Sequence, residues 1–161
     1  MDLHSLLNLK VEPGGELIHG SAYYRSLDRA VEISPASYIP GARTKTLALG
    51  KLVLSLEGIT QRLVGLRAFT PSNRWKVEDT EPPPAADTQG GVSFTLDFRG
   101  QDLCFYNLYP KYEFHAPDNS LRIRVRGSFD LVIRVGDCLL LGMDRAGILT
   151  DFWLEGLRFT A

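Results

Sequence analysis

The chain has 161 residues, a hydrophobic fraction of 44%, a charged fraction of 23% and a formal net charge of -1. This length is sufficient for one domain with a substantial core, and the composition is average for a globular protein. The balanced charge excludes an overall bias toward nucleic acid or acidic lipid, and no apolar stretch approaches the length of a membrane span. We expect one domain over residues 1–161, no targeting segment and no membrane partner.

Cysteine usage favours the cytoplasm. Cys104 and Cys138 both lie inside apolar strand patterns and do not form a Cys-x-x-Cys motif. We therefore expect buried free thiols rather than a disulfide or a metal pair, as is typical of cytoplasmic proteins.

The first half is predicted to be mainly β. Leucines at positions 3–9 are compatible with one or two helical turns, which Pro13-Gly14-Gly15 would end. Short apolar runs then alternate with turn residues at the spacing of sandwiches and barrels, so little helix is expected. The candidate strands are Leu17–Tyr24, Ala30–Ser34, Thr44–Leu49, Leu52–Leu56 and Leu63–Phe69.

A linker is predicted over residues 70–91. It contains Pro82-Pro83-Pro84 and Gly90-Gly91, a composition that favours extended, solvated backbone over sheet pairing. Only Trp75 indicates that part of the segment packs down. The candidate strands after it are Val92–Phe98, Leu103–Leu108, Tyr112–His115, Leu121–Val125, Leu131–Val135, Cys138–Met143 and Leu149–Leu154.

Two parts of the chain share one layout. Gly50-Lys51 and Gly136-Asp137 each precede an apolar strand and lie 86 residues apart, as do Leu63 and Leu149. Glycine as the first of two hairpin residues accepts positive φ and suits primed turns. The segments 28–33 and 118–123 extend the match at a slightly different offset.

This layout predicts two related β-meanders, at residues 17–69 and 92–159, in an antiparallel sandwich or barrel with pseudo-twofold symmetry. A rival register matches Gly65-Leu66-Arg67 to Gly156-Leu157-Arg158 but needs five extra residues before the last strand. Chance likeness of two meanders is the remaining alternative.

The second half resembles a family of very short bacterial domains of unknown function. The resemblance is carried by segment 112–123, by Val135-Gly136-Asp137 and by segment 141–149, which contains Asp144-Arg145-Ala146-Gly147. Neither copy has the glutamate that closes the final strand of that family. The resemblance implies a β-rich fold, and it implies no catalytic residue, substrate or cofactor.

A row of arginines is one candidate site. Arg122, Arg124 and Arg126 alternate with apolar residues, so the row faces outward from a strand. Guanidinium groups in this pattern could contact phosphate or nucleic acid. The alternative is a solvated sheet face neutralised by neighbouring carboxylates, which the balanced net charge favours.

Aromatic residues form the second candidate site. Those between positions 105 and 114 are Phe105, Tyr106, Tyr109, Tyr112 and Phe114. They fall on both faces of a strand, so the strand is either buried on both sides or presents one face to a ligand. Trp153, next to Phe152, raises the same question.

The sequence contains none of the usual catalytic or cofactor-binding motifs. His4, His19 and His115 lie far apart and lack metal-ligand spacing. Nucleophile-elbow, dinucleotide and P-loop motifs are absent, and no spacing singles out an acid-base pair. We expect no metal, no cofactor and no catalytic residue.

We therefore predict a non-catalytic binding or protein-interaction module, whose partner is another protein or a second copy of the chain. The alternative is a small-molecule-binding or enzymatic barrel with a pocket between the halves, lined by Tyr106, Tyr109, Tyr112 or Trp153. A cavity of at least about 300 Å³ with convergent polar groups would favour this alternative. Nucleic-acid contact through the arginine row is a weaker alternative.

Overall fold

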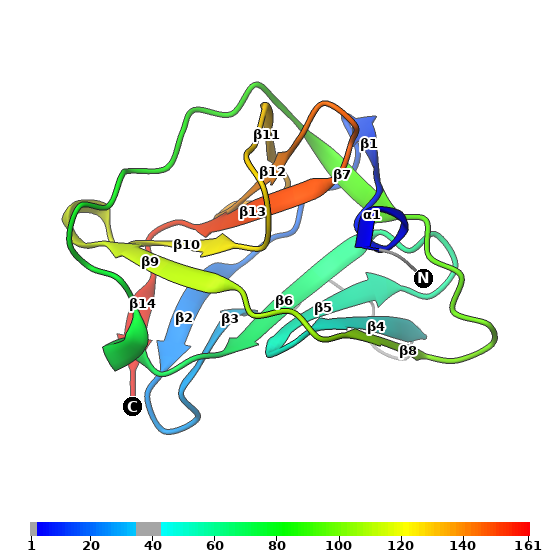
Figure 1. Cartoon of the computed structure of the whole chain (residues 1–161). Helices are drawn as coiled ribbons and strands as arrows, with labels where there is room; N and C mark the ends of the chain where they lie inside the picture. Colours follow the sequence, from blue (N-terminus) through cyan, green and yellow to red (C-terminus); the bar gives the residue numbers. More distant parts are fainter. Residues whose placement is uncertain (1–2, 35–42) are drawn as a thin grey trace.

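The computed structural model shows two packed β-sheets (Figure 1). The structure describes residues 3–34 and 43–161, and it does not describe the side chain of His4. Each sheet has seven strands and is mostly antiparallel, and side chains from both sheets meet in one hydrophobic core. The predicted mainly β fold is confirmed, in its sandwich form.

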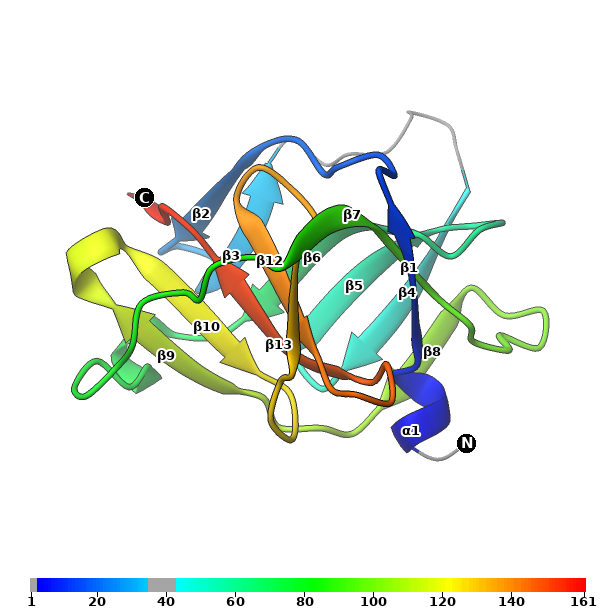
Figure 2. The same cartoon turned by 90° about the horizontal axis from the view of Figure 1, so that it is seen from above.

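The strands of both sheets are given in their spatial order, and Figure 2 views them from above. Sheet one is β1 (Leu9–Pro13), β7 (Thr88–Phe94), β11 (Leu131–Arg134), β12 (Leu139–Met143), β13 (Leu149–Leu154), β10 (Ser120–Arg124) and β9 (Lys111–His115). Sheet two is β14 (Arg158–Thr160), β2 (Ser21–Arg25), β3 (Ala30–Ser34), β6 (Leu63–Phe69), β5 (Leu52–Glu57), β4 (Thr44–Leu49) and β8 (Leu103–Tyr106). The described helical segments are α1 (Leu3–Leu6), η1 (Ser72–Arg74) and η2 (Ala116–Asp118). No helix in these parts of the chain is long and apolar enough to cross a bilayer.

The two sheets share one strand order. The series β9-β10-β13-β12-β11-β7 matches β2-β3-β6-β5-β4-β8, and in both series all pairs are antiparallel except the last, which is parallel. A register shift leaves a buried residue unpaired at the same place in each series, Val64 in β6 and Thr150 in β13. The correspondence supports the predicted pseudo-twofold relation, which stays a prediction.

The two halves of the chain are interlocked. Strand β8 from the second half pairs in parallel with β4, and β14 pairs in parallel with β2, so both complete sheet two. Strand β1 from the opening of the chain pairs with β7 in sheet one. Neither sheet is therefore built from one half alone.

Alternating burial explains why the strands pack as they do. In β5, Leu52, Leu54 and Leu56 are fully buried, whereas Val53 and Ser55 are partly exposed. Burying each leucine contributes about 1.5–3 kcal/mol relative to leaving it in water. The period of two thus directs one face of β5 into the core.

Several element boundaries differ from the sequence prediction. The opening helix is limited to Leu3–Leu6 and β1 follows it, while β2 begins at Ser21 rather than at Leu17. Strand β7 begins at Thr88, inside the predicted linker. Sheet pairing is feasible there because Gly90 lacks a side chain, and an added Cβ would lie 2.2 Å from the carbonyl oxygen of Glu12.

The two predicted glycine turns have different outcomes. Gly50 has φ +62° and forms a two-residue turn with Lys51 between β4 and β5, as predicted. The prediction for Gly136 was wrong, because residues 135–138 join β11 to β12 and Gly136 does not adopt positive φ. Gly136 is instead packed against the backbone, where an added Cβ would lie 2.5 Å from the carbonyl oxygen of Ile18.

Trp75 fixes the first part of the predicted linker, as its sequence context indicated. The Trp75 side chain is buried, and its indole nitrogen donates to the hydroxyl oxygen of Thr70 at 3.1 Å. Its ring centroid lies 5.0 Å from that of Tyr24 in β2 and 5.6 Å from that of Phe114 in β9. The segment therefore packs where the two sheets meet.

Candidate functional site

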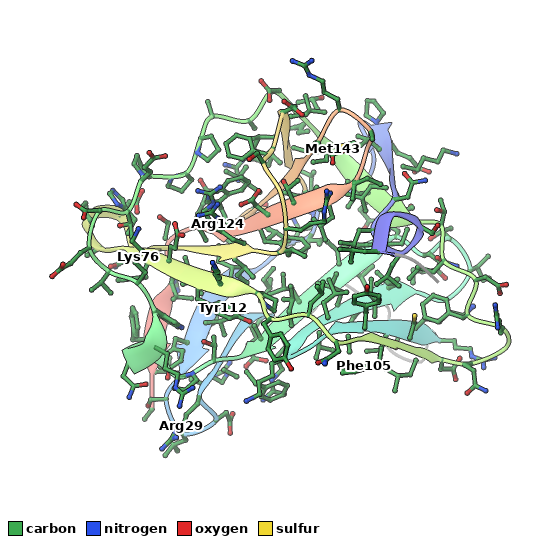
Figure 3. The ribbon with its side chains drawn as sticks, in the orientation of Figure 1. Arg29, Lys76, Phe105, Tyr112, Arg124 and Met143 are labelled. Carbon is green, nitrogen blue, oxygen red and sulfur yellow. The ribbon has the colours of Figure 1, made fainter. Side chains whose placement is uncertain are left out.

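A cleft of about 800 Å³ opens where sheet two meets β9 of sheet one. Its walls come from the β4–β5 turn, the segment after β6, strand β8, the connection between β8 and β9, and β9 itself. Phe105 on β8 and Tyr112 on β9, both labelled in Figure 3, line this cleft from different sheets. Both predicted repeats and the predicted linker contribute to it.

Aromatic side chains form much of the lining. Phe69, Phe105 and Tyr109 are 42%, 61% and 83% exposed, which is unusual for large apolar rings. Tyr112 is half-buried, its hydroxyl has no hydrogen-bond partner in the described part of the chain, and burial raises its pKa to about 12. Such a concentration of exposed rings at one concave place is typical of a binding surface.

Four cationic side chains surround these rings: Lys51, Arg74, Lys76 and Lys111. All four are exposed, and none forms an ion pair within residues 3–34 and 43–161. Glu113 is the one carboxylate among the described lining residues, and its charge is balanced by Arg124 at 3.1 Å. The cleft therefore carries uncompensated positive charge.

Backbone contacts hold these walls in place. Gly50 lets the β4–β5 turn approach the connection to β9, because an added Cβ would lie 2.0 Å from the carbonyl oxygen of Leu108. The backbone nitrogen of Lys76 donates to the carbonyl oxygen of Tyr112 at 3.0 Å, and that of Phe114 donates to the carbonyl oxygen of Lys76 at 2.8 Å. Lys76 is therefore attached to β9 like a short extra strand.

The predicted aromatic ligand contacts are divided among three places. Tyr109 and Tyr112 line the cleft, whereas Tyr106 is half-buried and packs against the core. Trp153 is buried away from the cleft in a separate apolar cluster with Val132 and Leu140. The structure therefore brings together two of the four predicted aromatic ligand contacts.

The arginine row is neutralised. Arg122 pairs with Asp151 at 2.8 Å, Arg124 with Glu113 at 3.1 Å, and Arg126 with Asp144 at 3.1 Å. This arrangement is the sheet face neutralised by neighbouring carboxylates that the balanced net charge favoured over phosphate binding.

Arg122 is also packed between aromatic rings. Its guanidinium carbon lies 5.6 Å from the ring centroid of Phe129 and 5.4 Å from that of Trp153. Asp151, its carboxylate partner, is almost completely buried. Arg122 is therefore part of the packing on the outer face of sheet one.

Sequence reasoning missed the cationic part of the cleft. Lys51 lies in a hairpin turn, Arg74 and Lys76 flank Trp75 in the predicted linker, and Lys111 begins β9. Their separation in sequence gives no motif. The one available signal was a tryptophan between two basic residues in an otherwise solvated segment.

The described lining combines aromatic faces and cations with a few other polar side chains. Histidine, cysteine and serine are absent from the described residues of the cleft. No group of three or more potential metal ligands occurs in the parts of the chain that the structure describes. Thr70, Asn107 and Glu113 supply the other polar side chains of the described lining.

Comparison with known protein families and curated proteins identifies no relative of this chain. No protein-family model matches the sequence, and no curated protein shows significant similarity to it.

Proposed function

We propose that the protein is a non-catalytic binding module whose cleft takes a small anionic molecule with an aromatic or apolar body. The observation that carries the proposal is the coincidence, in one cleft of about 800 Å³, of exposed rings with four cations that have no ion-pair partner among the described residues. Ligand sites typically have volumes of roughly 300–1,000 Å³ and combine an apolar lining with a few polar groups.

The distribution of charge supports an anionic ligand. Several arginines elsewhere on the surface form ion pairs, including Arg43 with Asp102 and Arg62 with Glu16. The cations of the cleft lack such partners in the described part of the chain, so an incoming anion would not have to displace a carboxylate. Low-dielectric walls around them would also strengthen the attraction.

A fluorescence titration with anilinonaphthalene sulfonate, an aromatic anion, tests the proposal. We expect saturable binding that weakens about tenfold when Lys51→Gln and Lys111→Gln are combined. Lys10→Gln is the control, because Lys10 is exposed on β1 and outside the cleft. Unchanged thermal unfolding of each variant would show that the dye is not reporting partial unfolding.

Two results would contradict the proposal. One is dye binding that does not saturate, and the other is equal affinity in the double variant and in the Lys10→Gln control.

Interaction with a protein or with a second copy of the chain is the second candidate. Strand β8 lies at the edge of sheet two, and its Leu103 and Phe105 side chains are mostly exposed. An exposed apolar edge strand can pair with a strand of another chain. Sedimentation over a range of concentrations should then show association that Leu103→Lys abolishes, whereas a monomer at every concentration would argue against self-association.

The remaining parts of the proposal rest on the sequence. Free Cys104 and Cys138 are compatible with the cytoplasm. The resemblance of the second half to short bacterial domains stays a proposal, and nucleic-acid contact through Arg122, Arg124 and Arg126 has the least support because each is ion-paired.

A further inference from the structure

A smaller hollow of about 290 Å³ lies beside the cleft. The two spaces share Pro71 and Arg74, and the other walls of the hollow include Arg29 in the β2–β3 turn and Ser72. Arg29 is labelled in Figure 3, in the turn between β2 and β3. Because Arg74 lines both spaces, one ligand could contact the cleft and the hollow together.

The hollow is cationic. Neither Arg29 nor Arg74 forms an ion pair or a ring contact within the described ranges of the chain. Carboxylates are absent from its described lining, and Asp28, next to Arg29 in sequence, faces Arg67 at 3.7 Å. Two arginines therefore line a small space that has no carboxylate among its described lining residues.

The segments that carry these arginines are attached to each other. The backbone nitrogen of Thr70 donates to the carbonyl oxygen of Arg29 at 2.8 Å. The backbone nitrogen of Ser72 donates to the hydroxyl oxygen of Tyr24 at 3.0 Å. The hydroxyl of Ser26 donates to the carbonyl oxygen of Thr160 at 3.0 Å, which attaches the β2–β3 turn to β14. The bonds of Thr70 and Ser72 limit the movement of the two arginine-bearing segments relative to each other.

We infer that the hollow is an anion subsite of the cleft and that the ligand is an aromatic phosphoester. Its phosphate would be held by Arg29 and Arg74, while its ring would lie against the exposed aromatic side chains of the cleft. Guanidinium groups bind phosphate oxygens through paired hydrogen bonds, and ring faces stack on aromatic side chains. The inference rests on the proposed function, which assigns the aromatic part of the site.

Calorimetric titration with adenosine, adenosine monophosphate and inorganic phosphate tests the subsite. Adenosine probes the aromatic lining of the cleft, inorganic phosphate probes the cations of both spaces, and the monophosphate probes rings and cations together. The Arg29 variants isolate the hollow, because Arg29 lines the hollow and not the cleft. We expect the monophosphate to bind about tenfold more tightly than adenosine. Arg29→Asn should remove most of this gain and leave adenosine affinity unchanged, whereas Arg29→Lys should retain part of it.

The variants are chosen to separate binding from folding. Arg29 has φ +50°, which asparagine tolerates better than most residues. Arg99→Asn is the matched control, because Arg99 has φ +52° and lies outside both spaces. It should affect none of the three titrations.

The two levels of the proposal fail differently. The subsite is overturned if adenosine monophosphate binds no more tightly than adenosine, or if Arg29→Asn and Arg99→Asn behave alike. If inorganic phosphate binds in an Arg29-dependent way while neither adenosine nor the aromatic dye binds, the anion site stands. The aromatic phosphoester assignment and the proposed function of the cleft are then overturned.

Discussion

An added Cβ at Gly50 would lie 2.0 Å from the carbonyl oxygen of Leu108. Gly50 belongs to the first half of the chain and Leu108 precedes β9 in the second, so this contact joins the halves at the wall of the cleft. The corresponding contact is between Gly136 and Ile18, at 2.5 Å from the added Cβ to the carbonyl oxygen. Each half therefore packs a glycine against the backbone of the other half, just before the strand β9 or β2.

Gly50→Ala should destabilise the fold strongly. The alanine would be strained at φ +62° and would also displace the backbone at Leu108, so we expect the free energy of unfolding to fall by at least about 2 kcal/mol. Gly156→Ala is the matched control, because Gly156 has φ +63° and no atom within 4 Å of an added Cβ. Urea unfolding of both variants measures the difference, and equal losses would show that the approach of Leu108 is no constraint.

Arg122→Met should cost more stability than its neighbour Arg124→Met. Asp151 is 1% exposed, so removing Arg122 leaves a buried carboxylate without its cation, which typically costs about 3–5 kcal/mol. Arg124 is 43% exposed and its partner Glu113 is 14% exposed, so the carboxylate left behind by Arg124→Met stays more solvated than Asp151 and the loss of stability should be smaller. Chemical denaturation of the two variants checks the prediction, which would be wrong if their losses were similar.

Local sequence signals predicted the fold well. The segments 28–33 and 118–123 match in sequence, and each contains a turn residue in the left-handed region, Arg29 at φ +50° and Asn119 at φ +53°. The strands that follow, β3 and β10, occupy corresponding places in the two sheets. Turn chemistry and period-two burial are local properties, and for this reason the sequence reveals them.

Long-range pairing could not be predicted in this way. Nothing in the sequence of β8 indicates that it pairs with β4, because a parallel edge pairing depends on the whole packed sheet. The cleft depends on the same pairing, since Phe105 and Lys51 reach it from elements far apart in the chain. Tyr109 and Tyr112 were found because aromatic clustering is visible locally, and the cations were missed because their convergence is not.

The two thiols should differ in reactivity. Burial, reinforced by the nearby charges of Asp137 and Glu155, raises the pKa of Cys138 to about 11, whereas Cys104 is half-buried. At about pH 8 an aromatic disulfide reagent should therefore modify Cys104 first and reach Cys138 only on unfolding. Absorbance kinetics of the Cys104→Ser variant check this, and rapid reaction of that variant would contradict it.

Tyr112→Phe should stabilise the protein and alter its response to alkaline pH. The phenol hydroxyl is buried without a partner in the described part of the chain, so its removal should raise the free energy of unfolding by about 1 kcal/mol at pH 9. Burial raises the pKa of Tyr112 from 10.0 to about 12. Below pH 10 the phenol is neutral in both the folded and the unfolded chain. Between pH 10 and 12 the unfolded chain loses this proton first, so the wild type loses stability there and the variant lacks that loss.

The difference in unfolding free energy between Tyr112→Phe and the wild type should therefore grow from pH 9 to pH 11 in urea titrations. Tyr109→Phe is the control, because its ring is 83% exposed and its removal should leave a difference near zero at both pH values. Subtracting the wild type at each pH cancels the titration of lysines and of the other tyrosines, which is common to all three proteins. A difference for Tyr112→Phe that stays constant with pH would mean that the hydroxyl is solvated or hydrogen-bonded in solution, and the burial of Tyr112 in the wall of the cleft would then be wrong.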